Sequence, residues 1–323
     1  MTDLINEHAA LTTSAGLVEL EPRTLIELTG GDRAAFLHNF CTNDIRRLTP
    51  GSGCEIFITN VQGKTIGHGY VFCEAESLLL DTAPGQAETL IAALDRYLIR
   101  EDAQLHDRGA LWRELLLAGP RAADVLRDLG LEKIPSAALD HEAAEVQAIA
   151  LRLRRIDWLG PETFELQIPT EAVQQVRDAM LAAGASACGA AAFDAVRIET
   201  GTPLFGRDIS PANLPQEVDR DQQAISFTKG CYLGQETVAR IDALGHVNKL
   251  LRGVRFSGSA IPEIGSELTR DGKAIGTVTS ATYSPRLQAP LALAYLRREA
   301  SQPGTALEGA TGPAEVVALP LGA

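Results

Sequence analysis

The sequence predicts an α+β protein of two or three domains that ends in a β-barrel. Its length of 323 residues exceeds the usual size of one domain. Its composition, with 45% hydrophobic and 22% charged residues, is typical of a folded globular chain. Before Lys249 predicted strands and helices are mixed, whereas only strands are predicted from Lys249 onward. This contrast indicates mixed α+β domains first and a separate barrel last.

The charge and the cysteine pattern exclude several classes of protein. The formal net charge of −13 removes the general attraction for phosphate backbones and anionic lipids, so we expect neither direct nucleic-acid binding nor a membrane partner. No run of about 18 apolar residues and no basic N-terminal segment followed by an apolar one occurs. The five cysteines form no C-x-x-C pair, which favours a reduced, cytoplasmic chain without a bound metal.

The first mixed region begins with a helix. Asp32 is a suitable N-cap for a helix. Its apolar face would consist of Phe36, Leu37, Phe40 and Cys41. A second amphipathic helix is expected from Pro84 to Leu98, with a further strand before His106. Strands with period-2 patterns are expected at residues 54–60, 65–72 and 78–81.

A second mixed region follows. Helices are expected after Pro120, after Thr170 and at residues 189–200, where Gly201 and Pro203 provide the usual end of a helix. Strands are expected at residues 114–118, 148–157 and 163–168.

The last region contains predicted strands alone. Pro211 and Pro215 mark an extended crossing segment that leads toward it. The strands are expected at residues 250–256, 267–270, 274–283, 291–296 and 315–319. Five strands without a helix indicate a β-barrel.

Residues 228–240, Thr-Lys-Gly-Cys-Tyr-Leu-Gly-Gln-Glu-Thr-Val-Ala-Arg, conflict most with local propensity. Thr228 would cap a helix, yet Gly230 and Gly234 would lie inside it at a cost of about 1 kcal/mol each. Cys231 would lie in the first turn beside Lys229, a setting that favours a reactive thiolate. The alternative is that the glycines only permit close helix packing around a buried cysteine.

Residues 229–236, Lys-Gly-Cys-Tyr-Leu-Gly-Gln-Glu, resemble the signature of the YgfZ family, the folate-binding relatives of the glycine-cleavage T-protein that support iron–sulfur enzymes. Residues 36–45 are similar to the family's FLxxxxTND segment and residues 197–208 to its RxExGxPxxGxD segment. Arg240 and residues 245–248 resemble the stretch before the final barrel. The resemblance implies a three-domain ring around a central hole that binds tetrahydrofolate.

The resemblance also implies roles for single residues. Glu199 would accept hydrogen bonds from the pterin ring, and an ion pair with Arg197 is the alternative. Cys231 and Lys229 are the catalytic candidates. Because folate is anionic and the chain acidic, local cations such as Lys229 and Arg240 would have to attract it. The further cofactor-binding candidates are Arg207, Asp208, Tyr232, Gly234, Gln235 and Arg240, of which Arg207 and Asp208 could equally be surface charges.

One position departs from the T-protein pattern. T-protein aminomethyltransferases carry an Asp in the first hairpin, where this chain has Gly67 or His68. A neutral imidazole accepts a proton but cannot stabilise a positively charged one-carbon unit as a fixed carboxylate does. The departure therefore counts against aminomethyl transfer, and a half-exposed strand residue is the alternative for His68.

The sequence thus predicts three domains: residues 1–48 with 112–205, residues 49–111 with 206–248, and residues 249–323. The first functional hypothesis is a tetrahydrofolate-binding accessory protein for iron–sulfur client enzymes, including radical enzymes that modify tRNA. The second is a folate-dependent aminomethyltransferase, and the third is a scaffold protein without catalysis.

Overall fold

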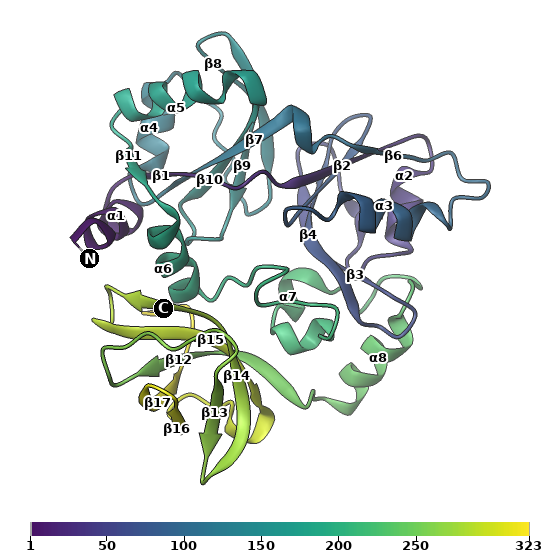
Figure 1. Ribbon diagram of the computed structural model, residues 1–323. Coiled ribbons are helices and arrows are strands. Elements are labelled where there is room, and N and C mark those ends of the chain that lie inside the picture. The colour runs from purple at the N-terminus through teal and green to yellow at the C-terminus, as the bar shows by residue number, and fades with distance from the viewer. Residues whose placement is uncertain (1, 323) are drawn as a thin grey trace.

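A computed structural model describes residues 2–322, which form two mixed α+β units and a closed barrel (Figure 1). The three units are arranged around α6 (Ala190–Thr200) and α7 (Asp221–Ala224). The predicted fold class is confirmed. Among the described residues, no helix is both long and apolar enough to cross a membrane.

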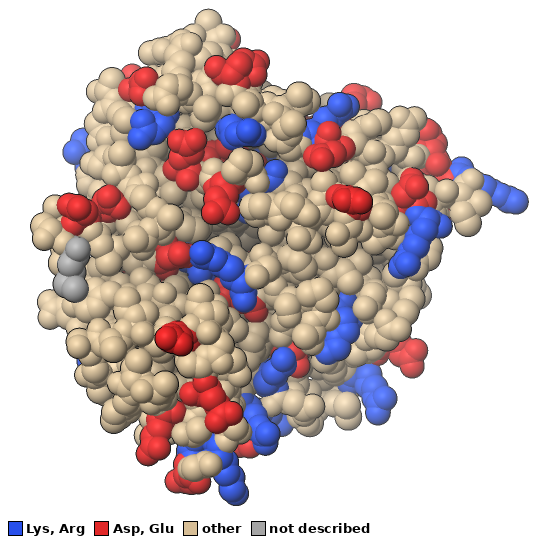
Figure 2. All heavy atoms as spheres, in the orientation of Figure 1, with Lys and Arg blue, Asp and Glu red and all other residues tan. Residues whose placement is uncertain are grey.

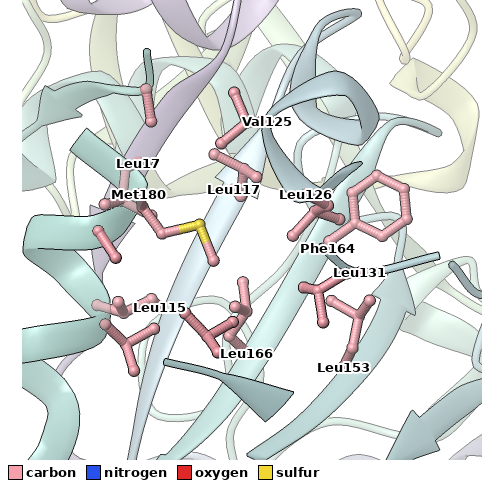
Figure 3. Packing of buried hydrophobic residues seen from close by; sticks show 14 of the residues in the cluster. Leu17, Leu115, Leu117, Val125, Leu126, Leu131, Leu153, Phe164, Leu166 and Met180 are labelled. Atoms are coloured by element: carbon pink, nitrogen blue, oxygen red, sulfur yellow. The ribbon is translucent and has the colours of Figure 1, made fainter. Parts of the chain in front are cut away.

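The first unit is a six-stranded sheet in the order β11-β1-β7-β10-β9-β8. Its apolar core lies between the sheet and helices α4 and α5, where Met180, Val125 and Leu126 pack against Leu117 and Phe164 (Figure 3). Its elements are α1 (Thr2–Thr13), β1 (Gly16–Glu19), β7 (Trp112–Ala118), α4 (Ala122–Asp128), β8 (His141–Val146), β9 (Ile149–Ile156), β10 (Thr163–Pro169), α5 (Val173–Ala182) and β11 (Ser186–Cys188).

The second unit is a five-stranded sheet in the order β3-β4-β5-β2-β6. Apolar side chains of its two helices, Phe36 and Leu37 of α2 and Leu90 and Leu94 of α3, belong to its core. Its elements are β2 (Thr24–Thr29), α2 (Arg33–His38), β3 (Gly53–Thr59), β4 (Thr65–Cys73), β5 (Leu78–Thr82), α3 (Ala87–Asp95) and β6 (Gln104–Asp107).

The sheet membership of residues 24–48 differs from the expected grouping, which placed them with the first unit. Strand β2 pairs antiparallel with β5 and β6, so it belongs to the five-stranded sheet. The sequence pattern predicts no element before the helix at Asp32, whereas α1, β1 and β2 precede it in the structure. The five-stranded sheet is therefore built from the continuous stretch 24–107, inserted between β1 and β7.

The remaining chain crosses to the barrel and closes it. Helix α7 packs against β3, and α8 (Gln235–Leu244) precedes the first barrel strand. The barrel order is β12-β15-β14-β13-β16-β17, and β12 pairs with β17 to close it. Its strands are β12 (Lys249–Phe256), β13 (Glu267–Arg270), β14 (Lys273–Ser284), β15 (Ala289–Arg297), β16 (Ala306–Gly309) and β17 (Gly312–Val317).

A buried group of charged residues joins the two sheets. Arg154 of β9 donates through Nη1 to Asp81 of β5 at 2.8 Å and to Glu165 of β10 at 2.6 Å. Arg23, between β1 and β2, donates through Nε to Asp81 at 2.6 Å and lies 3.2 Å from Glu114 of β7. Because Asp81 comes from one sheet and the other carboxylates from the other, the two units are held together by charge as well as by apolar contact.

Candidate functional site

A cavity of about 330 Å³ lies between the two sheets and α6. Figure 2 shows a hollow near the middle of this face, with acidic and basic side chains around it. The aromatic side chains of the lining are Tyr70, Trp158, Phe193 and Phe205, and its polar side chains include Arg23, His68, Asp194 and Arg207. A cavity of this size, mostly apolar with a few polar groups, is typical of a small-molecule site.

The aromatic wall is fixed by one hydrogen bond. Trp158 Nε1 donates to Tyr70 Oη at 2.7 Å, and the two ring centroids lie 5.9 Å apart. The ring centroids of Phe193 and Trp158 are 6.3 Å apart. This wall presents flat apolar surface, which suits a planar heteroaromatic ligand.

Arg23 provides a permanent positive charge at this wall. Its guanidinium carbon lies 4.6 Å from the centroid of the Trp158 ring. Burial opposes the charged form, but Asp81, Glu114 and Glu165 outweigh it and raise the pKa of Arg23 above its usual value. Among residues 2–322 the polar contacts of Arg23 use only Nε, and Nη1 and Nη2 are not shut off from solvent. The two Nη groups can therefore donate to an anion in the cavity.

A second cation and a carboxylate also line the cavity. Arg207 Nη1 donates to both carboxylate oxygens of Asp194, at 2.8 and 3.0 Å, and Arg197 Nε donates to Asp194 Oδ1 at 2.6 Å. The side chain of Arg207 is 52% exposed, and that of Asp194 is 26% exposed. Of the predicted cofactor-binding residues, Arg207 is the one that lines this cavity.

His68 lies in the cavity wall and is buried, with an exposed fraction of 6%, so it is not the half-exposed strand residue that we considered. Its Nε2 lies 2.7 Å from Glu55 Oε1, and Arg220 donates to the same carboxylate through Nε at 2.5 Å and Nη2 at 2.6 Å. Burial opposes ionisation of Glu55, but Arg220 and His68 lower the pKa of Glu55 to about 2. Glu55 is therefore a carboxylate at neutral pH, and it lies outside the cavity lining.

The predicted helix over residues 228–240 is wrong in its first half. Residues 228–234 are irregular, and α8 begins at Gln235 with Gly234 as N-cap at φ 83°. A Cβ at Gly234 would lie 2.9 Å from Gly63 Cα, so the positive φ and the hairpin backbone both require glycine. Cys231 is exposed on this irregular segment and has no place in a first helical turn.

Lys229 does not direct its charge at Cys231. Its Nζ is buried and donates to the backbone oxygens of His38, Cys41 and Asn43 at 2.5, 2.6 and 3.0 Å. Burial lowers the pKa of Lys229, although nearby Cys41 and Asp44 act in the opposite direction. The ammonium therefore fixes the segment after α2, and we assign it a structural role in place of the expected attraction of folate.

Three other residues predicted to bind the cofactor lie in this segment or in the helix after it. Tyr232 is buried in the apolar cluster beneath the barrel, and its ring centroid lies 4.8 Å from Lys229 Nζ. Gln235 Oε1 accepts from the Tyr232 backbone N at 3.3 Å. Arg240 is exposed on α8. None of the three lines the cavity beside α6.

Glu199 is buried at the junction of three parts of the chain. His8 Nε2 of α1 lies 2.7 Å from Glu199 Oε2, and Ser284 Oγ of the barrel donates to Glu199 Oε1 at 2.5 Å. The alternative ion pair with Arg197 is absent from residues 2–322. Glu199 also lies outside the lining of the cavity, where Asp194 of the same helix takes its place.

Asp208 is a buried structural residue. Its carboxylate accepts from Arg197 Nη1 at 3.0 Å, from Thr279 Oγ1 at 2.6 Å and from Ser280 Oγ at 2.7 Å. Because Thr279 and Ser280 belong to β14, Asp208 connects the segment after α6 to the barrel.

The recognised sequence motifs contain none of the cavity residues Arg23, Tyr70, Trp158 and Asp194. Asp194 carried a weak signal, because it precedes Arg197 of the recognised segment by three residues and so shares its helix face. The others come from segments far apart in the sequence, and no local pattern brings them together.

Comparison with known proteins matches nearly the whole chain. Residues 1–228 match the GCVT N-terminal domain and residues 249–321 the glycine cleavage T-protein C-terminal barrel domain. An aminomethyltransferase of Nostoc sp. is 28% identical over 331 residues, which cover 98% of this chain and 87% of that protein. An aminomethyltransferase of Streptomyces coelicolor is 29% identical over 333 residues, covering 97% and 88%.

A solved structure shares the fold. The glycine cleavage system aminomethyltransferase T of Bartonella henselae superposes with a TM-score of 0.82, covering 98% of this chain and 89% of that one. The sequence identity is 22%, so this likeness concerns the arrangement of the three units.

Proposed function

The chain belongs to the glycine cleavage T-protein family, and on this premise we propose that it binds tetrahydrofolate or a derivative in the cavity beside α6. The observation that carries the proposal is a fixed cation stacked on an aromatic wall, Arg23 on Trp158. The wall suits a flat pterin, and the Nη groups of Arg23 suit the carbonyl oxygen of that ring, while the half-exposed Arg207 suits the carboxylates at the other end of the ligand. Local cations are needed because the chain as a whole carries a charge of −13.

A carboxylate is also needed for the pterin, whose adjacent ring N–H and amino group donate side by side. Sequence reasoning favours Glu199 for this role. We propose Asp194 instead, because it lines the cavity and its side chain is 26% exposed, whereas Glu199 is buried outside the lining. Bound tetrahydrofolate would supply a carrier for one-carbon units, while the residues of the chain bind and orient it.

Calorimetric titration with tetrahydrofolate under anaerobic conditions tests both steps. The wild type is expected to bind, and Asp194→Asn to bind at least about tenfold more weakly, because a charged hydrogen bond contributes about 1.5–3 kcal/mol. Glu199→Gln, which keeps the size of the side chain, is expected to change the affinity less than about threefold. Absence of binding by the wild type would contradict the folate proposal. A larger loss of affinity in Glu199→Gln than in Asp194→Asn would identify Glu199 as the pterin acceptor.

We further propose that the protein resembles the YgfZ family in function and supports the assembly or repair of iron–sulfur enzymes, including radical enzymes that modify tRNA. The support is the segment at residues 229–236 together with the exposure of its cysteine. A thiol on the surface, outside the folate cavity, is accessible to a client protein. Contact with tRNA would then run through the clients, in keeping with the acidic charge.

Complementation of a strain that lacks this protein, with the wild type or with Cys231→Ser, tests the role of the thiol. The wild-type chain is expected to restore the activity of iron–sulfur tRNA-modifying enzymes, and Cys231→Ser to restore at most about a tenth of it, because serine is not a comparable nucleophile. Cys188→Ser is the matched control, since burial and Glu7 raise the pKa of the Cys188 thiol to about 11. Full restoration by Cys231→Ser would exclude thiol chemistry.

An aminomethyltransferase is the second candidate, favoured by the names of the relatives. It is weakened by the first hairpin, where Gly67 or His68 stands in place of the Asp of those enzymes. The nearest carboxylate, Glu55, lies behind the imidazole and is paired with Arg220. Formation of methylene-tetrahydrofolate from an aminomethyl donor would establish this activity. A partner complex that persists without any folate binding would instead indicate a scaffold protein.

A further inference from the structure

Three residues from separate segments form a hydrogen-bonded chain that ends at the folate cavity. His68 of β4 and Glu55 of β3 point to the same face of the five-stranded sheet, since Glu55 pairs with Tyr70 and Phe57 with His68. The chain runs from His68 Nε2 to Glu55 Oε1 and from the Glu55 carboxylate to Arg220. Arg220 in turn lies 3.9 Å from Asp157.

The chain determines which imidazole nitrogen carries the proton. Glu55 is ionised and can only accept, so Nε2 must be the donor in the 2.7 Å contact. A neutral imidazole has one N–H, and Nδ1 is then left as an acceptor. Among residues 2–322 no group is bonded to Nδ1, and this atom is not closed off from solvent, although His68 is 6% exposed. Because His68 lines the cavity and Glu55, on its Nε2 side, does not, Nδ1 is the ring nitrogen left to face the cavity.

We infer that His68 Nδ1 is a hydrogen-bond acceptor for an N–H group of the ligand in this cavity, and that Glu55 and Arg220 are positioning residues that fix the accepting tautomer. The inference rests on the proposed folate binding and names the polar group that recognises an N–H edge of the pterin. A neutral His68 offers this acceptor without the fixed negative charge of a carboxylate.

The surroundings of His68 hold its ring in one orientation. The charged groups that face His68 are Glu55 and, behind it, Arg220, while Tyr70 of β4 and Phe57 of β3 pack against the ring. A protonated imidazole has no acceptor, so a ligand that donates an N–H to Nδ1 binds the neutral ring.

Tetrahydrofolate affinity tests the inference with two variants. His68→Asn places its carbonyl oxygen near the position of Nδ1, so it is expected to bind within about threefold of the wild type. His68→Phe has no acceptor and is expected to bind at least about tenfold more weakly. His246→Gln, an exposed histidine on the connection to β12, is the control and should behave as the wild type.

The outcomes separate this inference from the proposed function. If the wild type does not bind tetrahydrofolate, the proposal of folate binding is wrong, and the inference with it. If the wild type binds and His68→Phe binds equally well, only the role of His68 is overturned. Nitrogen NMR of the labelled, ligand-free protein provides a second measurement, in which the neutral form of His68 should carry its proton on Nε2. A proton on Nδ1 would contradict the inference independently of any variant.

Discussion

Replacing Arg154 with methionine is expected to lower the free energy of unfolding by about 3–5 kcal/mol, because the change leaves buried carboxylates without a partner. Arg154 is fully buried and pairs with Asp81 and Glu165. Oxygen atoms of Asp81, Glu114 and Glu165 lie within 4.8 Å of one another. Without the guanidinium, Arg23 would remain as the cation of this group, and the contact between the two sheets would lose most of its charge balance.

Urea unfolding at several pH values measures this effect. Burial, Asp81 and Glu165 already raise the pKa of Glu114 well above its usual value. Arg154 lowers the pKa of Glu114 and of Glu165, so its removal raises both further. A carboxyl with a raised pKa stabilises the fold below its unfolded pKa and loses that contribution as pH rises through its folded pKa. The deficit of Arg154→Met should therefore be largest near pH 8 and smaller near pH 4.5. Arg127→Met, at an exposed pair with Asp124, should cost less than about 0.5 kcal/mol, and equal losses in both variants would contradict the argument.

Lys229→Met is expected to lower the free energy of unfolding by about 3 kcal/mol. The substitution removes a buried ammonium that donates to three backbone oxygens, at His38, Cys41 and Asn43. Hydrogen exchange should accelerate first at residues 38–44, because these carbonyls lose their common donor. Lys273→Met, at an exposed lysine of the barrel, is the matched control. Stability unchanged by Lys229→Met, or local exchange unchanged, would show that the ammonium does not hold this segment.

The order of elements was largely predictable from the sequence, and their grouping was not. The absence of helical periodicity after Lys249 predicted the barrel, and Gly201, at φ 81°, ends α6 as expected. The helix expected from Thr228 is wrong in its first half, because Gly234 has a left-handed conformation and α8 begins six residues later than expected. Strands β1 and β2 are short, at four and six residues, and a period of two is hard to recognise over so few positions.

The candidate site was less predictable than the fold. Conspicuous motif residues such as Lys229, Glu199 and Asp208 satisfy buried partners within the protein. The cavity is instead lined by residues such as Arg23 and Trp158, whose contact depends on how two sheets pack together. A sequence motif identifies residues that matter to the fold or to the ligand, and only the packing of distant segments tells these two roles apart.

The insertion of the five-stranded sheet between β1 and β7 also sets an order of events on the ribosome. All partners of β2 to β6 are complete once Asp107 has been made, whereas β1 pairs with β7 and β11, which end at residues 118 and 188. Since chains are made from the N-terminus and domains fold as units, the inserted sheet can acquire tertiary structure first. During that interval β1 is an unpaired strand beside a finished sheet, and the emergence of β7 is the event that commits the nascent chain to its second sheet.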